Sequence, residues 1–560
     1  MTIANLKPTR STRPVRWVMP SGWTVVVLAI AALMLSPVLA VGISAFGNSS
    51  DVWQHLTATV LPLYVKNSLV LMVGVGLGVL GLGTSTAWLV TMCQFPGRRI
   101  LEWALLLPLA APAYLLAYTY TDLLEYFGPV QTALRTWFGW QSATDYWFPN
   151  MRSLGGAILL FSLVLYPYVY MLVRVAFLEQ SLCTLEASRS LGCNPWRSFW
   201  TVALPLARPA IAAGTALALM ETLNDFGTVE YFSVPTFTTG IYRTWLGMGD
   251  RAAAAQLSTV ALAFIVVLIT LERVSRRQAR YYQAAGRHQS GSRYELGGIR
   301  AAAALLICVL PIVLGLLLPG WLLVQMTLRT LDTALNDTFF TLAKHSLILS
   351  GLSALLAVML SVMLAYGARL QRGRLVQWGV QAAALGYAIP GAVIAVGVMV
   401  PLGQFDNAVD GWMRSQFGIS TGLLLSGTIA GLIFAYLVRF LAVALGSVDA
   451  GLTKIRPTLD DAARSLGYSP TQTLTHVHAP LLGGSLLTAA VLVFVDVMKE
   501  LPATLVIRPF NFDTLAIRVF QYASDERLAE ASAPAIAILL VGLLPVILLS
   551  WRIAHPRSGV

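Results

Sequence analysis

Four carboxylates inside apolar segments are the side chains that most directly suggest chemistry. Glu221 and Asp225 lie four residues apart near the end of one apolar run, and Asp496 and Glu500 repeat this spacing near the end of another. Residues at i and i+4 share one helix face. Ionisable groups in spans usually face a cavity or pathway, and hard cations prefer oxygen ligands. The pattern indicates a cation path; the alternative is that these acids lie at the water interface or pair locally, for example with Lys499.

Other reactive residue types form no recognisable site. The four cysteines show no CxxC spacing, and the six histidines are scattered, which argues against a zinc site, a disulfide framework or a catalytic centre. The sequence contains no Gly-Lys dipeptide, so it has no P-loop for nucleotide phosphates. We therefore expect no enzyme, no permanent metal site and no bound cofactor in this chain.

The elements that must position the acids are membrane-spanning helices. Of the 560 residues, 57% are hydrophobic and 11% are charged, with a mean hydropathy of +0.70. Apolar runs long enough to cross a bilayer as helices fall into two sets of six. The first set is 22–46, 64–92, 100–121, 154–178, 207–226 and 255–271, and the second is 301–326, 345–368, 376–402, 421–446, 482–498 and 533–551. These runs predict an all-α polytopic membrane protein of about twelve spans.

Charge predicts the orientation of these spans. The first apolar run is longer than a signal-peptide core and follows a basic start, so we interpret it as a retained anchor with a cytoplasmic N-terminus. Threading twelve spans from there leaves both termini in the cytoplasm, with most basic residues inside and most acidic residues outside. The net charge of +12 then reflects orientation in the lipid bilayer, and no nucleic-acid partner is needed to explain it.

The two sets of spans are similar in sequence. Residues of the same or related type recur at an offset of 275, which predicts a first repeat at 1–275, a cytoplasmic linker at 276–295 and a second repeat at 296–560. Matched pairs include Glu221 with Asp496, Asp225 with Glu500, Thr239 with Thr514, Arg243 with Arg518, and Asp250 with Asp525. Six spans per half make the repeats parallel, so we expect a pseudo-two-fold arrangement with a path between the halves.

A polar segment interrupts the spans once in each half, at 185–205 and 459–480. Each copy has an opening acid, a small residue, a glycine, a proline three residues later and a closing proline. These residues are Glu186, Ala187, Gly192, Pro195 and Pro205 in the first copy, and Asp461, Ala462, Gly467, Pro470 and Pro480 in the second. Glycine favours a left-handed turn after a helix and proline the start of the next one. The skeleton predicts a helix, a bend and a second short helix.

This skeleton resembles the Glu-Ala-Ala signature of permease subunits of binding-protein-dependent ABC importers. Ser188 and Asp461 depart from the signature, as do the two valines at its isoleucine position and Ala479 at its leucine. The resemblance implies a type I ABC permease fold in the bacterial inner membrane. It also implies that the two segments are coupling helices that dock on two copies of a separate ATPase, which uses the ATP. The alternative is an amphipathic loop lying on lipid headgroups.

The regions 224–250 and 499–532 are similar to fused, two-repeat permeases of ferric iron importers, a layout that thiamine permeases share. The resemblance implies a periplasmic binding protein that delivers iron, and we expect Arg243 and Arg518, with the acids Asp250, Asp525 and Glu526, to receive it. The alternative is that these charges only solvate loops. We expect the four span acids to form a weak vestibule for the ion. A twelve-helix secondary transporter is the alternative from a different class; it would have no ATPase to receive the polar segments.

Overall fold

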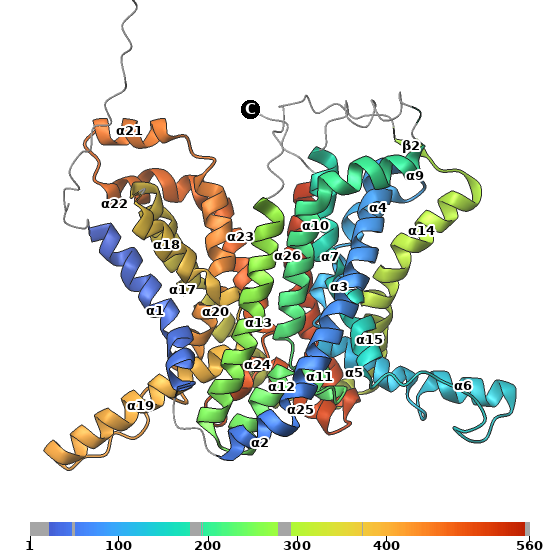
Figure 1. Cartoon of the computed structure of the whole chain (residues 1–560), viewed down its shortest axis with the longest axis horizontal. Helices are drawn as coiled ribbons and strands as arrows, with labels where there is room; N and C mark the ends of the chain where they lie inside the picture. The colour runs from blue at the N-terminus through green and yellow to red at the C-terminus, as the bar shows by residue number, and fades with distance from the viewer. Residues whose placement is uncertain are drawn as a thin grey trace, which may run out of the picture.

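The computed structural model describes residues 22–46, 51–179, 192, 194–277, 293–371 and 373–554, and it is almost entirely helical (Figure 1). Within these residues, eleven helices are long and apolar enough to cross a membrane, and a bent pair raises the number to twelve. The predicted all-α membrane fold is confirmed.

The long helices of the first half are α1 (Gly22–Ser44), α3 (Leu61–Met92), α7 (Leu154–Glu179), α10 (Leu204–Asn224) and α13 (Arg251–Arg277). Those of the second half are α14 (Gly298–Ile312) with α15 (Leu318–Arg329), α17 (Asp337–Leu370), α19 (Gly391–Phe417), α20 (Ile429–Leu452), α23 (Ala479–Met498) and α26 (Leu528–Ala554).

Shorter helices complete the architecture. Those of the first half are α2 (Asp51–Thr59), α4 (Arg98–Ala104), α5 (Ala113–Leu124), α6 (Pro129–Phe138), α9 (Pro195–Ser198), α11 (Gly227–Tyr231) and α12 (Phe237–Tyr242). Those of the second half are α16 (Leu331–Ala334), α18 (Arg374–Ala383), α21 (Pro457–Ser465), α22 (Pro470–Thr473), α24 (Pro502–Ile507) and α25 (Leu515–Ser524). Two-residue strands β1 (Cys93–Gln94) and β2 (Tyr294–Glu295) pair in parallel, which attaches the end of the predicted linker to the end of α3.

The third span of each half is broken, so the expectation of continuous helices at 100–121 and 376–402 is wrong. In the first half, α4 and a 3₁₀ turn end before Pro112, and the chain bends by 89° into α5 and α6. In the second half, α18 and a 3₁₀ turn end before Pro390, where α19 begins. Ala111 and Ile389 are both extended (ψ 119° and 131°) because a residue before proline is pushed out of the helical region.

The fifth span of each half begins earlier than its apolar run. Five-residue π-helical segments, Phe199–Ala203 and Leu474–His478, join α9 to α10 and α22 to α23 without a break. Pro205 and Pro480 each lie within the first two residues after the π segment. Proline lacks an N–H and collides with the carbonyl four residues earlier, and a wider π turn accommodates both effects. The predicted second short helix is therefore the first turn of a span.

The hydrophobic core is divided between two clusters, and each contains spans of both sequence halves. Helix α1 packs against α17, α18 and α19, together with α13. In the other cluster, α14 and α15 lie beside α3, α4 and α5, and α26 packs on the 3₁₀ turn Leu107–Ala110 (Figure 1). The first and last spans of each predicted repeat thus belong to the core of the other. The boundaries 1–275 and 296–560 describe the sequence, whereas the packing units are interleaved.

The short elements gather at two opposite ends of the bundle. Figure 1 shows α9, α21 and α22 at one end, and α2, α11, α12, α24 and α25 at the other. Both polar segments therefore lie at the same end, which we call the coupling end, and the opposite end is the outer end. Helix α6 and the last part of α19 extend sideways at the outer end.

Candidate functional site

The second polar segment forms two helices joined at a left-handed glycine. Helix α21 ends at Ser465, and Gly467 has a φ of +84°. The Gly467 N–H donates to the Arg464 carbonyl, and the Tyr468 N–H donates to the Ala463 carbonyl. Ser469 and Gln472 then form a capping box that starts α22 at Pro470. This is the helix, bend and helix expected from the sequence.

The two neighbouring acids of α21 point in different directions. The Asp461 side chain is 72% exposed and lies 3.7 Å from Arg464, and Ala462 is also exposed. Asp460 is turned inward instead, where its Oδ1 lies 2.6 Å from His478 Nε2 and its Oδ2 accepts from Arg369 Nε at 2.8 Å. The segment therefore presents Asp461 and Ala462 as an exposed knob, while Asp460 attaches it to the bundle.

Arg369 and His478 extend this attachment into the spans. The Arg369 guanidinium also donates to the carbonyls of Leu452 and Ile455, and His478 is fully buried. We call the contacts of Asp460, Arg369 and His478 the clamp. The sequence offset places Leu185 and Ala203 at the positions of Asp460 and His478, so the first half does not have this pair of polar groups.

The first polar segment is only partly described. Glu186 and Ala187 lie outside the described residues. Gly192 has a φ of +80°, the same left-handed conformation as Gly467, and the Asn194 side chain accepts from the Arg197 N–H at 2.8 Å, which caps α9. Pro205 and Pro480 occupy equivalent places after their π segments.

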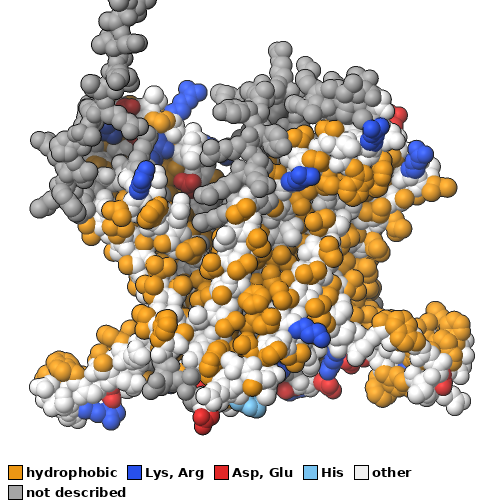
Figure 2. All heavy atoms as spheres, in the orientation of Figure 1, with side chains coloured by type: hydrophobic (Ala, Val, Ile, Leu, Met, Phe, Trp, Pro, Cys, Tyr) orange, Lys and Arg blue, Asp and Glu red, His pale blue; other side chains and the backbone are white. Residues whose placement is uncertain are grey.

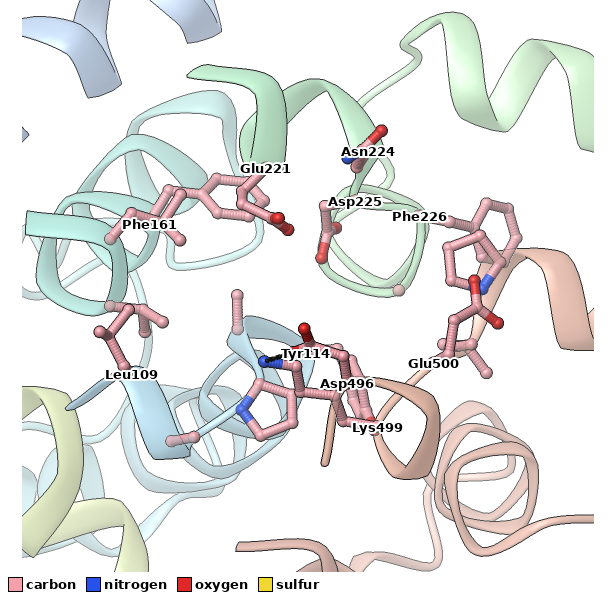
Figure 3. Close-up of a pocket in the computed structure, with 18 of the residues that line it drawn as sticks. Leu109, Tyr114, Phe161, Glu221, Asn224, Asp225, Phe226, Asp496, Lys499 and Glu500 are labelled. Carbon is pink, nitrogen blue, oxygen red and sulfur yellow. Dashed lines mark ion pairs between the residues drawn. The ribbon is translucent and has the colours of Figure 1, made fainter. Parts of the chain in front are cut away.

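All four predicted path acids line one cavity between the two halves (Figure 3). The cavity holds about 120 Å³ and is bounded by residues of both sequence halves. Its walls come from 109–114, 161–168 and 221–227 in the first half, and from Tyr387, 439–440 and 496–502 in the second. Because α10 and α23 end there, the matched positions of the two halves converge on one space.

The expectation that each acid pair lies on one helix face needs correction. Helix α10 ends at Asn224 and α23 at Met498, so Asp225 and Glu500 lie just past the helix ends. Asp225 accepts from the N–H groups of Thr228 and Val229 at the start of α11. Glu500 accepts from two N–H groups at the start of α24 in the same way. These two acids therefore also cap short helices, a structural role that spacing alone did not indicate.

The second pair of acids is neutralised by basic side chains, whereas the first is not. Asp496 lies 3.0 Å from Lys499 Nζ, and the buried Glu500 accepts from Arg439 Nη1 at 2.7 Å. Asn224 occupies the position that matches Lys499. Within the described residues, Glu221 forms no ion pair, and it lines the cavity together with Tyr387 of the other half. Four carboxylates against two cations leave the cavity with an excess of negative charge.

The cavity does not form a ready chelating site. Among the described residues, no three histidine, cysteine, aspartate or glutamate side chains are grouped closely enough to hold a metal ion. Glu221 and Asp225 face the same space as Asp496 in Figure 3, but they come from separate walls. This arrangement is better suited to weak, transient binding of an ion than to tight binding, because conduction requires binding weak enough for the ion to leave.

Sequence reasoning missed three side chains of this site. Arg439 lies inside an apolar span, and as an ionisable residue there it could have been identified as a partner for a buried acid. Tyr114 is buried in the cavity wall, and its hydroxyl has no hydrogen-bond partner among the described residues. Tyr387 of the second half lines the cavity together with Glu221 of the first. Tyrosines in apolar spans carry no sequence signal that separates a cavity wall from an ordinary core.

The two predicted docking arginines lie at the outer end in local ion pairs. Arg243 Nη2 is 3.0 Å from Glu230, and Arg518 Nη2 is 3.5 Å from Asp513. Of the acids expected beside them, Asp250 accepts from the Ala253 N–H at the start of α13, and Glu526 lies 3.9 Å from Arg152. The positions match between halves, but the partner acids do not.

The sequence is similar to membrane components of known transport systems. Residues 79–282 match the family described as "binding-protein-dependent transport system inner membrane component". An Fe(3+)-transport system permease protein of Haemophilus influenzae is 28% identical over 494 residues, covering 87% of this chain and 89% of that protein. A molybdenum transport system permease protein of Escherichia coli is 32% identical over 207 residues, covering 87% of that protein and 35% of this chain. A ferric transport system permease protein of Actinobacillus pleuropneumoniae is 22% identical across 95% of this chain.

Proposed function

Because this chain belongs to the family of inner membrane components of binding-protein-dependent transport systems, we propose that it is the permease of an importer of ferric iron. The observation that carries the proposal is the extent of similarity. Three relatives that match 87–95% of the chain are named as Fe(3+) or ferric permeases, whereas the molybdenum permease matches about a third of it. The chain supplies the path, and a separate ATPase supplies the energy.

The cavity charge supports a cation over an oxyanion. Its four carboxylates outnumber Lys499 and Arg439, and both basic groups are already paired with acids. An oxyanion such as molybdate would meet net repulsion in a site of low dielectric constant, while a cation would be attracted. Among the described residues, no basic side chain lies within ion-pair distance of Glu221 or Asp225, so we propose that these two acids carry most of the attraction for the passing ion.

Coupling to ATP hydrolysis is assigned to the two polar segments. We propose that each inserts its knob, Glu186 with Ala187 in one and Asp461 with Ala462 in the other, into one of two ATPase subunits. Gly192 and Gly467 set the bend, and Pro205 and Pro480 follow the π segments inside the spans. Because the π segments join α9 to α10 and α22 to α23 without a break, we expect a displacement of the polar segments to move the helices that carry Glu221 and Asp496.

The orientation follows from this assignment. The coupling end is cytoplasmic, as are both termini, and the outer end faces the periplasm, where Arg243 and Arg518 receive the binding protein. Complementary charges at such a rim act mainly on association rate. A topology reporter fused after residue 290 should report the cytoplasm, and a periplasmic signal there would contradict the orientation.

Reconstituted transport tests the function directly. The chain, its ATPase and its binding protein are placed in proteoliposomes, and uptake of radiolabelled ferric iron, molybdate and thiamine is followed with and without ATP. We expect ATP-dependent uptake of iron alone. An ATPase variant that binds but does not hydrolyse ATP provides the control. ATP-dependent uptake of molybdate or thiamine without iron would overturn the substrate assignment.

The role of the acids has a separate test. Glu221→Gln with Asp496→Asn removes one matched acid from each half while preserving side-chain size. We expect iron uptake to fall, with ATPase assembly and binding-protein docking unchanged. Unaltered uptake would mean that these acids are structural and that the ion takes another path.

A further inference from the structure

Two arms project from the bundle at the outer end, one from each half. The first arm is 125–150, which contains α6, and the second arm is 401–428, which contains the last part of α19 and the return to α20. Both extend sideways, away from the bundle axis, at the same level (Figure 1). Each follows the broken third span of its half, and the first of these spans contributes Pro112 and Tyr114 to the cavity wall.

The first arm is held together by internal contacts and presents aromatic side chains outward. Arg135 donates to the Tyr126 carbonyl at 2.7 Å, and the Tyr146 hydroxyl donates to Gln131. Trp140 stacks on Phe138 and on Tyr146 with ring centroids 4.7 Å apart. These contacts satisfy the polar groups internally. Three large side chains nevertheless remain 80–90% exposed: Phe127, Trp137 and Trp147.

The second arm has the same design built from different residues. Asp410 accepts from the Thr421 N–H at 2.8 Å and pairs with Arg414 at 2.7 Å, which ties the return segment to α19. Asp406, on the same side of the helix, accepts from the Leu425 N–H. The next face carries Phe405 and Trp412, two turns apart and both more than half exposed. Polar groups are thus held on one side, and aromatic groups remain on the other.

We propose that both arms lie on the outer leaflet of the lipid bilayer, with their aromatic faces in the interfacial layer. Hydrophobic side chains cover the spans and occur again on both arms (Figure 2). On the second arm, Figure 2 shows basic side chains on the side away from that belt. Tryptophan is enriched where a membrane protein meets the interface, and an amphipathic helix lies there with its apolar face toward the acyl chains.

The lipid surface fits better than a protein partner. The two arms point in opposite directions from the bundle (Figure 1), so a single binding protein centred on the outer end would not cover both aromatic faces. A bilayer surrounds the bundle and reaches both at once. The arms then hold the breaks at Pro112 and Pro390 at a fixed depth, which keeps this cavity wall in place while other helices move.

Site-directed spin labelling tests the proposal in the full-length chain. Single cysteines replace Trp137 and Trp412 in a background without the four native cysteines, and the labelled proteins are reconstituted in phosphatidylcholine vesicles. Thr136→Cys and Asn407→Cys are matched controls, because both residues are exposed and lie on other faces of the same helices, about 100° from Trp137 and about 140° from Trp412. Collision of each label with oxygen, which concentrates in lipid, is compared with collision with a water-soluble nickel chelate.

We expect labels at 137 and 412 to favour oxygen several-fold over the nickel chelate, relative to labels at 136 and 407. Equal nickel access at all four sites would show that the arms stand in water and would overturn the proposal. Protection from both reagents at 137 and 412, appearing only when binding protein is added to the vesicles, would identify the arms as a protein docking surface and would also overturn it.

Discussion

In the described part of the chain, Glu221 is the cavity acid that neither forms an ion pair, as Asp496 and Glu500 do, nor caps a helix, as Asp225 does. We expect Glu221→Gln alone to lower iron uptake roughly tenfold, because a contact to a charged group contributes about 1.5–3 kcal/mol and 1.4 kcal/mol is a factor of ten. Radiolabelled uptake into proteoliposomes measures the effect. Glu125→Gln is the control, since Glu125 pairs with Arg152 at the outer end and does not line the cavity. Equal uptake in the two variants would contradict the role of Glu221.

Asp460 and Asp461 are adjacent residues with opposite expected effects. Asp460→Ala leaves Arg369 and the buried His478 without their carboxylate, and we expect a loss of about 1–3 kcal/mol in stability. Asp461→Ala removes an exposed acid, so its stability should change by no more than about 0.5 kcal/mol while ATPase binding weakens. Thermal unfolding of the purified chain and ATPase pull-down measure the two effects. Equal loss of stability in both variants would contradict the assignment of the clamp.

At the scale of the element, a control variant separates the effect of losing the bend at Gly467 from the effect of replacing a glycine elsewhere in the same half. Gly467→Val forces a β-branched residue to a φ of +84°, which costs about 1–2 kcal/mol. We expect transport-coupled ATP hydrolysis to fall, because the knob loses its fixed direction. Gly483→Val is the control: Gly483 lies in α23 with open space around its Cβ position. Normal coupling in Gly467→Val, or the same loss in both variants, would mean that the left-handed turn is not required.

At the scale of the whole molecule, the interleaved cores make a prediction about separated halves. If the chain is divided within 278–292, α1 and α13 still need the second half for burial, and α14, α15 and α26 still need the first. We therefore expect each half to be degraded when expressed alone and to accumulate when both are expressed together. Membrane abundance and co-purification measure this. Stable accumulation of either half alone would show that the sequence repeats fold independently.

The sequence by itself determined the membrane class, the polar segments and the positions of the four acids. Each of these depends on composition or on short-range spacing: apolar runs fix the spans, glycine and proline fix local turns, and the 275-residue offset relates one half to the other. The left-handed turns at Gly192 and Gly467 were predictable for the same reason, since a backbone preference acts within a few residues.

Only the tertiary structure decided which partners these residues have. Asp496 and Lys499 are only three residues apart, so the sequence offered this pair as an alternative. Whether Glu500 contacts Arg439, 61 residues away, depends on how the spans pack. Hydropathy likewise does not predict that α1 packs with spans of the second half and α14 with spans of the first, because an apolar helix can pack against either set of neighbours. The breaks at Pro112 and Pro390 lie inside apolar runs, where length and hydropathy predict one continuous helix. Local chemistry allows several packing arrangements of these helices. Contacts between residues far apart in the sequence select one of them, and that arrangement places the four acids around one cavity.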